Sequence, residues 1–422
     1  MLQKLQTMPN WKRNIVVLWF GTFMTGVGFS EITPFMPFYI GTLGKFTTGQ
    51  LNFYAGVVFA ITFLVSAIAS PLWGRLADTK GRKLMLLRTS LGMAVVISMM
   101  GLVTNVWQLF LLRALQGIFS GFVSNANALI ATETPKGYSG RALGILVTGM
   151  TSGSLIGPLL GGALASMMSY RMIFFVTGML LFIVFLLSLI LVHETYKPQV
   201  LKTKETGEKT KPLSLKEVFG QVRYPHLVVG LLITTMIIQA SNNSINPILS
   251  LYVRQLMHNR GNVEFTAGLI AAFPGIATIL AAPKFGKLGD KIGTDKMLIG
   301  GFLWAFSVFF ATSFAKDITQ LMILRFFVGI SDATMLPAVN ALLAKSTPVN
   351  ITGRVFSYNQ SFQSMGNVLG PMIGTTVGTN FGYSGVFGST SILVLLNLIL
   401  FWINSKEIRE ERHLGEYRAH NH

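Results

Sequence analysis

Long apolar stretches alternate with short polar segments along the whole chain. Each stretch has roughly 20 residues or more, the length that an α-helix needs to cross the hydrocarbon core of a membrane. The first stretch is too long for the apolar core of a signal peptide and has no cleavage-site pattern, so we expect it to remain in the protein. The pattern predicts twelve membrane-spanning helices, over residues 15–40, 51–73, 84–104, 107–131, 141–164, 171–192, 226–252, 265–285, 297–315, 319–343, 354–379 and 383–403.

The composition agrees with an integral membrane protein and excludes several classes of site. Only 12% of the residues are charged, whereas a soluble domain has about 25%. The chain has no cysteine, which excludes disulfides and cysteine-based metal or nucleophile sites. Its six histidines lie in predicted loops, helix ends or the tail, and no phosphate-binding P-loop motif occurs. We therefore predict no enzyme site, no metal centre, no cofactor and no ATP-driven step.

The basic residues are distributed unequally between the two sides of the predicted membrane. When residues near the ends of spans are counted with the adjoining loops, 27 Lys and Arg fall on the side of both termini and 5 on the opposite side, and Arg113 and Arg325 are the two that lie deeper inside spans. Such a bias is typical of cytoplasmic loops, so we expect both termini in the cytoplasm. We also expect the protein to lie in the plasma membrane of a bacterium. The net charge of +18 then reflects topology and contact with anionic lipid. It does not indicate binding to nucleic acid.

A polar stretch over residues 193–225 divides the predicted spans six to six. Its centre, KPQVLKTKETGEKTKP, is typical of a flexible linker. We expect an N-terminal six-helix bundle (1–192), a cytoplasmic linker (193–225), a C-terminal six-helix bundle (226–403) and a cytoplasmic tail (404–422). Within the linker, SLKE at 214–217 fits a capping box, so a short surface helix and an irregular loop both remain open.

The two halves repeat one pattern. GRLADTKGRK at 74–83 lies 212 residues before GKLGDKIGTD at 286–295, and residues 140–161 match 353–374 at an offset of 213. Pro34 also matches Pro247 at that offset. Partners are separated by six spans, an even number, so both halves have the same orientation. Parallel repeats of this kind, arranged around a central cavity, are typical of one large class of transporters.

Three motifs resemble those of the major facilitator superfamily. GRLADTKGRK resembles its signature loop between spans two and three, and FLLRALQG at 110–117 resembles its span-four motif. GSLIGPLLGG at 153–162 resembles the antiporter motif on span five of the exporting branches. The resemblance covers essentially the whole chain and is greatest for the twelve-span drug:proton antiporters. It implies an all-α membrane fold of two parallel six-helix repeats.

The antiporter motif has a physical interpretation of its own. Gly153, Gly157 and Gly161 recur at every fourth position and share one helix face, where small residues allow another helix to approach closely in lipid. Pro158 removes a backbone donor and bends the helix, and Gly162 adds a further small residue. Ordinary tight packing is the alternative. The resemblance implies that this face meets span eight and limits leakage.

The signature loop is a candidate conformational gate on the cytoplasmic side. Gly74 and Gly81 allow tight turns and close helix contacts. The resemblance implies that Asp78 contacts span eleven when the protein faces outward, and that Arg82 pairs with Glu133 at the end of span four. The second copy of the loop lacks the two basic residues at its end, so we expect a weaker latch there.

Two acids lie inside predicted spans, Glu31 in span one and Asp332 in span ten. A carboxylate there is costly, and neither acid has an acidic counterpart in the other half, which favours a functional role. We predict that Glu31 carries protons and lines a central cavity; a fixed ion pair with Arg113 is the alternative. The resemblance implies that Arg113 tunes a nearby carboxylate. Asp332 lies two helical turns after Arg325, on the same face.

Candidate substrate-binding residues fall into two groups. The polar run QASNNSINP at 239–247 suggests a partly broken helix that lines a cavity. Aromatic and methionine side chains near the acids can contact flat apolar cations, although most such residues in apolar helices serve packing. The candidates are Gln239, Asn242, Asn243, Asn246, Phe35, Tyr39, Phe122 and Met335.

These observations predict a proton-coupled exporter of amphipathic or cationic drugs that works by alternating access. A proton-coupled transporter of a defined metabolite, sugar or lipid is the alternative, which the three asparagines of span seven favour. The expected partners are a small-molecule substrate, protons and the lipid bilayer, with no nucleic acid, and the expected state is a monomer. Nothing in the sequence supports an embedded enzyme.

Overall fold

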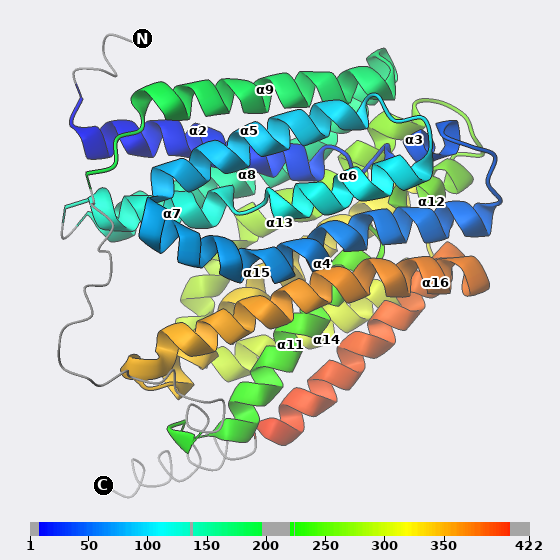
Figure 1. Ribbon diagram of the computed structural model, residues 1–422. Helices are drawn as coiled ribbons and strands as arrows, with labels where there is room; N and C mark the ends of the chain where they lie inside the picture. The colour runs from blue at the N-terminus through cyan, green and yellow to red at the C-terminus, as the bar shows by residue number, and fades with distance from the viewer. Residues whose placement is uncertain (1–7, 136–137, 196–219, 223, 406–422) are drawn as a thin grey trace, which may run out of the picture. The chain divides into compact units, whose positions relative to one another are not determined.

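The structure is a computed structural model that describes residues 8–135, 138–195, 220–222 and 224–405. It describes no side chain for a few residues inside helices, among them Asp78. The proposed capping box at 214–217 lies outside the described residues. Throughout the described part of the chain the regular structure is helical (Figure 1), as the apolar pattern predicts.

The chain divides into two compact units. The first comprises Met1–Gly207 together with Asn246–Gly275, and the second comprises Glu208–Ile245 together with Ile276–His422. The structure thus groups residues 246–275 with the first unit, although they belong to the second sequence repeat. The predicted division into bundles at 1–192 and 226–403 stays a prediction.

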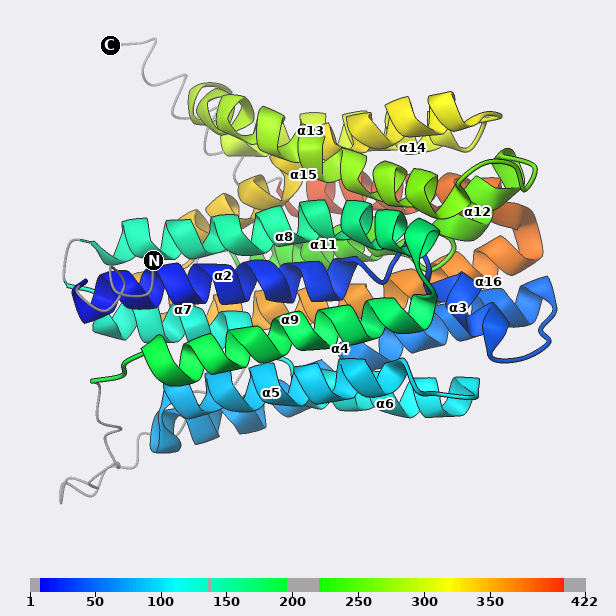
Figure 2. The ribbon, with the colours of Figure 1, turned by 90° about the horizontal axis from the view of Figure 1, so that it is seen from above.

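Helices of the first unit pack side by side in a bundle. α2 lies beside α8 and α9, α5 lies beside α9, and α4 lies beside α6 (Figure 2). The helices are α2 (Asn10–Ser30), α3 (Met36–Thr42), α4 (Thr48–Lys80), α5 (Arg82–Met100), α6 (Val106–Ile118), α7 (Phe122–Glu133), α8 (Ser139–Met167), α9 (Tyr170–Leu191), α12 (Leu249–Leu256) and the start of α13 (Val263–Ile292).

The second unit contains the remaining long helices. α11 packs along α16, and α14 packs against both α15 and α16. The helices are α11 (Pro225–Ser244), the end of α13, α14 (Thr294–Thr312), α15 (Ile318–Ser346) and α16 (Val349–Asn404).

Ten helical segments in the described residues are long and apolar enough to cross a membrane, so the chain is a multi-pass membrane protein. The twelve predicted stretches exceed this number for two reasons. α16 includes both of the last two stretches, which meet at Gly382, where φ is 73° and ψ is 171°. The first stretch is interrupted by turns between α2 and α3.

The interruption in the first stretch has a counterpart in the seventh. Turns occupy residues 31–35 around Pro34, and turns also separate α11 from α12 around Pro247. Proline has no backbone N–H and disfavours helical geometry in the residue before it, so both helices end at these places. The prolines are partners in the sequence repeat, and the repeat therefore appears in the backbone as well.

The predicted span over residues 107–131 corresponds to one candidate membrane span, Val106–Glu133, but its helix is interrupted near the middle. α6 ends at Ile118 and α7 begins at Phe122, and Gly121 between them has φ 107°. The break frees backbone carbonyls that cannot remain without partners inside a membrane. Arg88 of α5 donates to the carbonyls of Ile118 at 3.4 Å and Ser120 at 3.2 Å.

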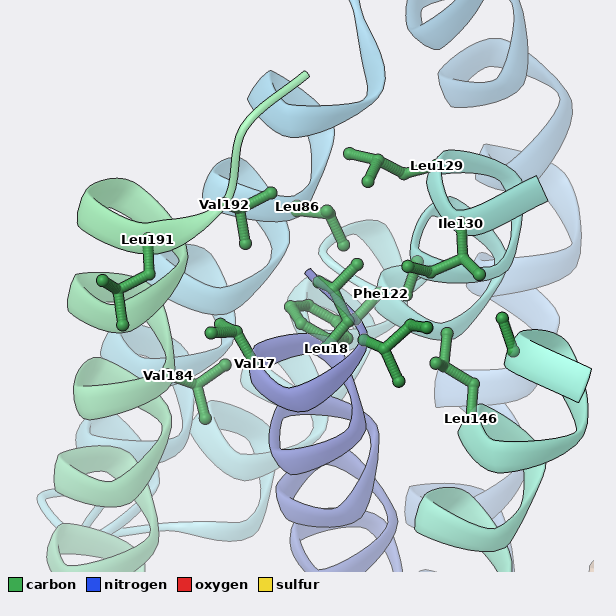
Figure 3. Close-up of a cluster of buried hydrophobic side chains, with 13 residues drawn as sticks. Val17, Leu18, Leu86, Phe122, Leu129, Ile130, Leu146, Val184, Leu191 and Val192 are labelled. Carbon is green, nitrogen blue, oxygen red and sulfur yellow. The ribbon is translucent and has the colours of Figure 1, made fainter. Parts of the chain in front are cut away.

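A cluster of buried apolar side chains holds the helices of the first unit together (Figure 3). Leu18 of α2, Leu86 of α5, Phe122 of α7 and Leu146 of α8 converge there. Phe122 is 1% exposed and also packs on the backbone at Gly21. The cluster positions α2, and with it the turn that carries Glu31.

Candidate functional site: two buried acids

Glu31 is the first residue after α2, at the start of the turns that interrupt the span. Its backbone N–H still donates to the carbonyl of Val27 at 2.8 Å, and its side chain is 2% exposed. Pro34 lies three residues after Glu31 and prevents α2 from continuing. The carboxyl therefore lies at a helix end and not along a regular helix face. Figure 2 shows this end of α2 between α8 and α9.

Thr177 of α9 contacts the Glu31 carboxyl. Its hydroxyl lies within hydrogen-bond distance of Glu31 Oε1 and also of the carbonyl of Ile173, the latter at 2.9 Å. A hydroxyl has one hydrogen and two acceptor lone pairs. It can donate to an ionised Glu31, or it can donate to Ile173 and accept from a protonated Glu31. The geometry therefore provides a hydrogen bond for both protonation states.

Arg113 of α6 is buried at 2% exposure but is held by other groups. Its Nη1 donates to Gln116 Oε1 at 2.8 Å, and its guanidinium carbon lies 5.3 Å from the centre of the Phe59 ring. Its buried Nε has no hydrogen-bond partner among the described residues. Glu31 and Arg113 thus contact different groups in the described part of the first unit. A fixed ion pair between them is absent there.

Asp332 lies on α15 in the second unit and contacts α11. Asn242 Nδ2 donates to Asp332 Oδ1 at 2.7 Å. Arg325, 4% exposed, precedes Asp332 by two helical turns on the same face of α15. Within the described residues, Arg325 Nε and Asn242 Oδ1 are buried polar atoms without a hydrogen-bond partner. The second unit therefore holds an acid, an amide and a guanidinium together.

The other polar residues of span seven are partly buried. Asn243 Nδ2 donates to the carbonyl of Gln239 and to Asn367 Oδ1, both at 3.0 Å. Gln239 packs on the backbone at Gly366 of α16. Asn246 lies in the turn between α11 and α12. Their role in substrate binding stays a prediction.

The aromatic candidates of span one are fully buried. Phe35 stacks on Tyr170 with ring centres 5.7 Å apart, and Tyr39 lies 4.9 Å from the Phe174 ring. Tyr39 Oη donates to the carbonyl of Met100 at 2.5 Å. In this structure these rings serve packing between α3 and α9, and a substrate would reach them only if the packing opened.

Met335 and Phe122 are likewise buried, at 2% and 1% exposure. Met335 packs against Gly301 of α14, while Phe122 belongs to the apolar cluster of Figure 3. A substrate contact at either residue would require the surrounding side chains to move. Sequence alone does not separate such packing residues from cavity-lining ones, because the two share one composition.

The glycine face of the antiporter motif packs against α2. A Cβ built at Gly153 would meet the backbone of Phe23, and one at Gly157 would lie 3.0 Å from the carbonyl oxygen of Val27. A Cβ at Gly161 would lie 2.6 Å from the carbonyl carbon of Glu31. The resemblance had implied that this face meets span eight. Here it sets the distance between α8 and the end of α2 that carries Glu31.

Contact with span eight comes from the neighbouring face of α8. A Cβ at Gly162 would lie 2.5 Å from the carbonyl oxygen of Glu264 on α13, and one at Gly268 would meet the carbonyl of Pro158. Proline at position 158 leaves α8 continuous, since the helix runs from Ser139 to Met167. Two faces of one helix therefore approach two different helices.

The glycine packing is repeated in the second unit. A Cβ at Gly374 would lie 2.6 Å from the carbonyl carbon of Ser244, and one at Gly370 would lie 2.6 Å from the carbonyl oxygen of Ala240. Gly374 and Ser244 are the partners of Gly161 and Glu31 at the offset of 213. The acid is therefore an addition to a helix contact that both halves contain.

The candidate gate is described in part. Gly74 and Asp78 lie on α4, and the Asp78 side chain is outside the described set, so its contact with span eleven stays a prediction. Gly81 has φ 95°, a conformation that favours glycine. The Glu194 carboxylate accepts from the backbone N–H groups of Arg82 at 2.8 Å and Lys83 at 2.9 Å. It caps the N-terminus of α5, where negative charge is stabilised.

Glu194 had no signal in the sequence, because it lies more than a hundred residues from the helix it caps. At the same end of the unit, Arg82 Nη1 donates to the carbonyl of Ala128 on α7. Glu133, the last residue of α7, accepts from the backbone N–H of Thr195 at 2.7 Å and from its hydroxyl. Pairing of Arg82 with Glu133 stays a prediction.

A cavity of about 470 Å³ lies at the other end of the first unit. Tyr170 Oη, on its wall, donates to Glu264 Oε1 at 2.9 Å. Arg254 lies with its guanidinium carbon 5.2 Å from the centre of the Phe38 ring. These contacts join residues 246–275 to α3 and α9, and no sequence pattern indicates them because the partners are far apart in the chain.

The fold and the two acids define a multi-pass helical membrane protein with an internal repeat and ionisable groups inside its spans. The model of the Major Facilitator Superfamily matches residues 18–263 and 231–420. The chain belongs to that superfamily.

Relatives and solved structures agree. The multidrug resistance protein MdtG of Escherichia fergusonii is 48% identical over 406 residues, which cover 96% of this chain and 98% of that protein. MdtG of Citrobacter koseri is 48% identical over 95% of this chain and 97% of its own length. An inward-facing, unoccupied bacterial homolog of the human lysosomal transporter Spinster has a TM-score of 0.79 at 16% identity, with 95% and 98% of the two chains covered. The nucleoside transporter NupG has a TM-score of 0.77 at 14% identity, with 94% and 100% covered.

Proposed function

We propose that this chain exports amphipathic or cationic drugs across a bacterial plasma membrane in exchange for protons. Relatives that are 48% identical over nearly the whole chain are named multidrug resistance proteins. The substrates and the antiport are therefore expected to be those of a multidrug efflux pump. The chain is a transporter and carries out no covalent chemistry.

The observation that carries the proton-coupling part is the arrangement at Glu31. A proton carrier must be stable both with and without its proton, and the Thr177 hydroxyl offers a hydrogen bond to either form. The carboxyl is buried at a helix end, where a small change in the turns at 31–35 alters its surroundings. Protonation and the position of α2 are thereby linked.

Asp332 supplies a second titratable group, and energetics favour a role for it. At 100 mV one charge moving inward yields about 2.3 kcal/mol, and one pH unit adds about 1.4 kcal/mol. Exchange of one proton for one monovalent cation moves no net charge, so only the pH gradient contributes to the driving force. Exchange of two protons for one cation recovers the electrical part, and two buried acids permit it.

We further propose that the chain works as a monomer with both termini in the cytoplasm. The distribution of Lys and Arg supports this orientation. A C-terminal green fluorescent protein fusion folds and fluoresces only when the C-terminus is cytoplasmic. A fusion that is expressed at a normal level but does not fluoresce would refute the proposed orientation.

The central experiment follows ethidium uptake into everted vesicles that contain the purified chain, after an interior-acid gradient is imposed. Glu31→Gln removes the charge and keeps the shape. Asp317→Asn is the matched control, because Asp317 is an exposed acid that caps α15 and asparagine caps a helix equally well. Protein content of the vesicles is measured for each variant.

We expect wild type and Asp317→Asn to accumulate dye. Glu31→Gln is expected to exchange dye in the absence of a gradient but not to accumulate it. If Glu31→Gln accumulates dye as wild type does, Glu31 is not the carrier and Asp332→Asn becomes the variant to test. If wild type ignores the gradient for a panel of cations, the multidrug proposal fails and a defined metabolite, sugar or lipid becomes the substrate to seek.

A further inference from the structure

An apolar groove of about 350 Å³ lies in the second unit between α13, α14 and α15. Leu288 and Ile292 of α13 line it, together with Gly300 and Trp304 of α14. Three of these side chains are exposed to a large extent: Leu288 by 40%, Ile292 by 41% and Trp304 by 43%. Apolar side chains that are exposed on a membrane protein require a nonpolar partner in the bilayer.

The groove has a basic end. Among the described residues that line it, Lys296 carries the one charge. It lies in the first turn of α14, next to the loop that the Lys and Arg distribution assigns to the cytoplasmic side. From Lys296 to Trp304 the helix rises about 12 Å toward the membrane interior. The groove thus has a positive charge at the membrane surface and an apolar wall below it.

These features match one kind of occupant. A phospholipid has an anionic headgroup at the interface and an acyl chain below it, in the same order and spacing. A lysine near the surface of a membrane attracts anionic lipid, and basic pockets between helices on the cytoplasmic side hold such headgroups. The cationic substrates proposed above are disfavoured, because the described lining offers them a lysine and no acid.

We propose that the groove binds one anionic phospholipid of the cytoplasmic leaflet, with the phosphate at Lys296 and one acyl chain along Gly300 and Trp304. The described lining includes neither Glu31 nor Asp332, and the proposal does not depend on the transported substrate. The lipid fills a gap between three helices of the second unit.

Two substitutions address the two parts of the site. Lys296→Gln removes the charge at an exposed position. Gly300→Leu fills the groove, and a Cβ at Gly300 meets nothing within 4 Å, so the backbone has room for it. Lys316→Gln is the control for charge. Lys316 is an exposed lysine that lies two residues before the N-terminus of α15 and does not line the groove. Gly144→Leu is the control for bulk, at another glycine whose Cβ would meet nothing within 4 Å.

Wild type and the four variants are purified from vesicles of equal amounts of phosphatidylethanolamine and phosphatidylglycerol, and bound lipid is counted by native mass spectrometry. We expect wild type and both controls to retain one phosphatidylglycerol. Lys296→Gln should lower the ratio of phosphatidylglycerol to phosphatidylethanolamine roughly five-fold, the effect of one lysine near an anionic surface. Gly300→Leu should lose the tightly bound lipid of either kind.

Three results would overturn the proposal. Equal retention in all five proteins would mean that the lipid is only annular. An unchanged ratio in Lys296→Gln would remove the headgroup assignment, and this variant is informative even if Gly300→Leu fails to fold. Labelling of Trp304 by a photoactivated cationic dye, with no loss on addition of phosphatidylglycerol, would make the groove a drug site.

Discussion

Replacing Gly161 with alanine tests how closely α8 approaches the end of α2. The added Cβ would lie against the carbonyl group of Glu31, 2.6 Å from its carbon and 2.9 Å from its Cα. These are backbone atoms and cannot rotate away, so one of the two helices must shift. Gly144→Ala is the matched control in the same helix, because its Cβ meets nothing within 4 Å.

The expected difference between the two variants follows from two opposing effects. Alanine is favoured over glycine within a helix by about 1 kcal/mol. This gain applies to both positions and cancels in the comparison. Overpacking a tight contact costs about 1–3 kcal/mol. Gly161→Ala should therefore have a free energy of unfolding about 1–3 kcal/mol lower than that of Gly144→Ala, roughly 5- to 150-fold in the equilibrium constant.

Unfolding by sodium dodecyl sulfate in mixed micelles, followed by tryptophan fluorescence, measures this difference. Gly374→Ala provides an internal repetition, because the same contact recurs at Ser244 in the second unit. We expect a loss of the same size there. Equal unfolding curves for Gly161→Ala and Gly144→Ala would refute the close contact between α8 and α2.

Three further predictions concern other side chains of the first unit. Thr177→Val, which removes the hydroxyl beside Glu31, should slow gradient-driven ethidium accumulation roughly ten-fold through loss of about 1.5 kcal/mol, while Thr177→Ser should restore it; equal rates for the two would argue against the hydroxyl. Phe122→Ala should lower the free energy of unfolding by about 3–5 kcal/mol because it leaves a cavity in the apolar cluster, and a loss below about 1 kcal/mol in the detergent assay would place the ring outside the core. Tyr170→Phe and Glu264→Leu each remove one partner of the hydrogen bond between these two side chains and should each destabilise the protein by about 1 kcal/mol or more. The loss in the double variant should be about 1 kcal/mol smaller than the sum of the two single losses; additive losses would show that the two side chains do not interact.

The helical architecture was predictable because lipid leaves the backbone few options. A chain that crosses the hydrocarbon core must satisfy every N–H and C=O within its own segment, so a long apolar stretch implies a helix. The same rule, together with Pro34 and Pro247, made the interruption of span seven predictable. The break at Gly121 was not predicted, and the residue that donates to the freed carbonyls, Arg88, belongs to another helix.

The candidate site was predictable only in part. Glu31 and Asp332 stand out in the sequence because an acid inside an apolar stretch is rare. Their partners do not stand out: Thr177 and Asn242 are ordinary polar residues, and they lie 146 and 90 residues from the acids they contact. Aromatic candidates such as Phe122 illustrate the opposite difficulty, since packing residues and cavity-lining residues have the same composition.

By itself the sequence determined the membrane-spanning helices, the internal repeat, the family and the two acids, because these depend on composition and on spacing along one segment. The tertiary structure alone decided which groups meet. In the tertiary structure the Gly161 face packs against the backbone of Glu31 rather than against span eight. Glu194 caps the N-terminus of α5, and Thr177 contacts the Glu31 carboxyl. Such contacts join residues that are distant in the chain, and helix packing selects them through shape and hydrogen bonding that no single segment encodes.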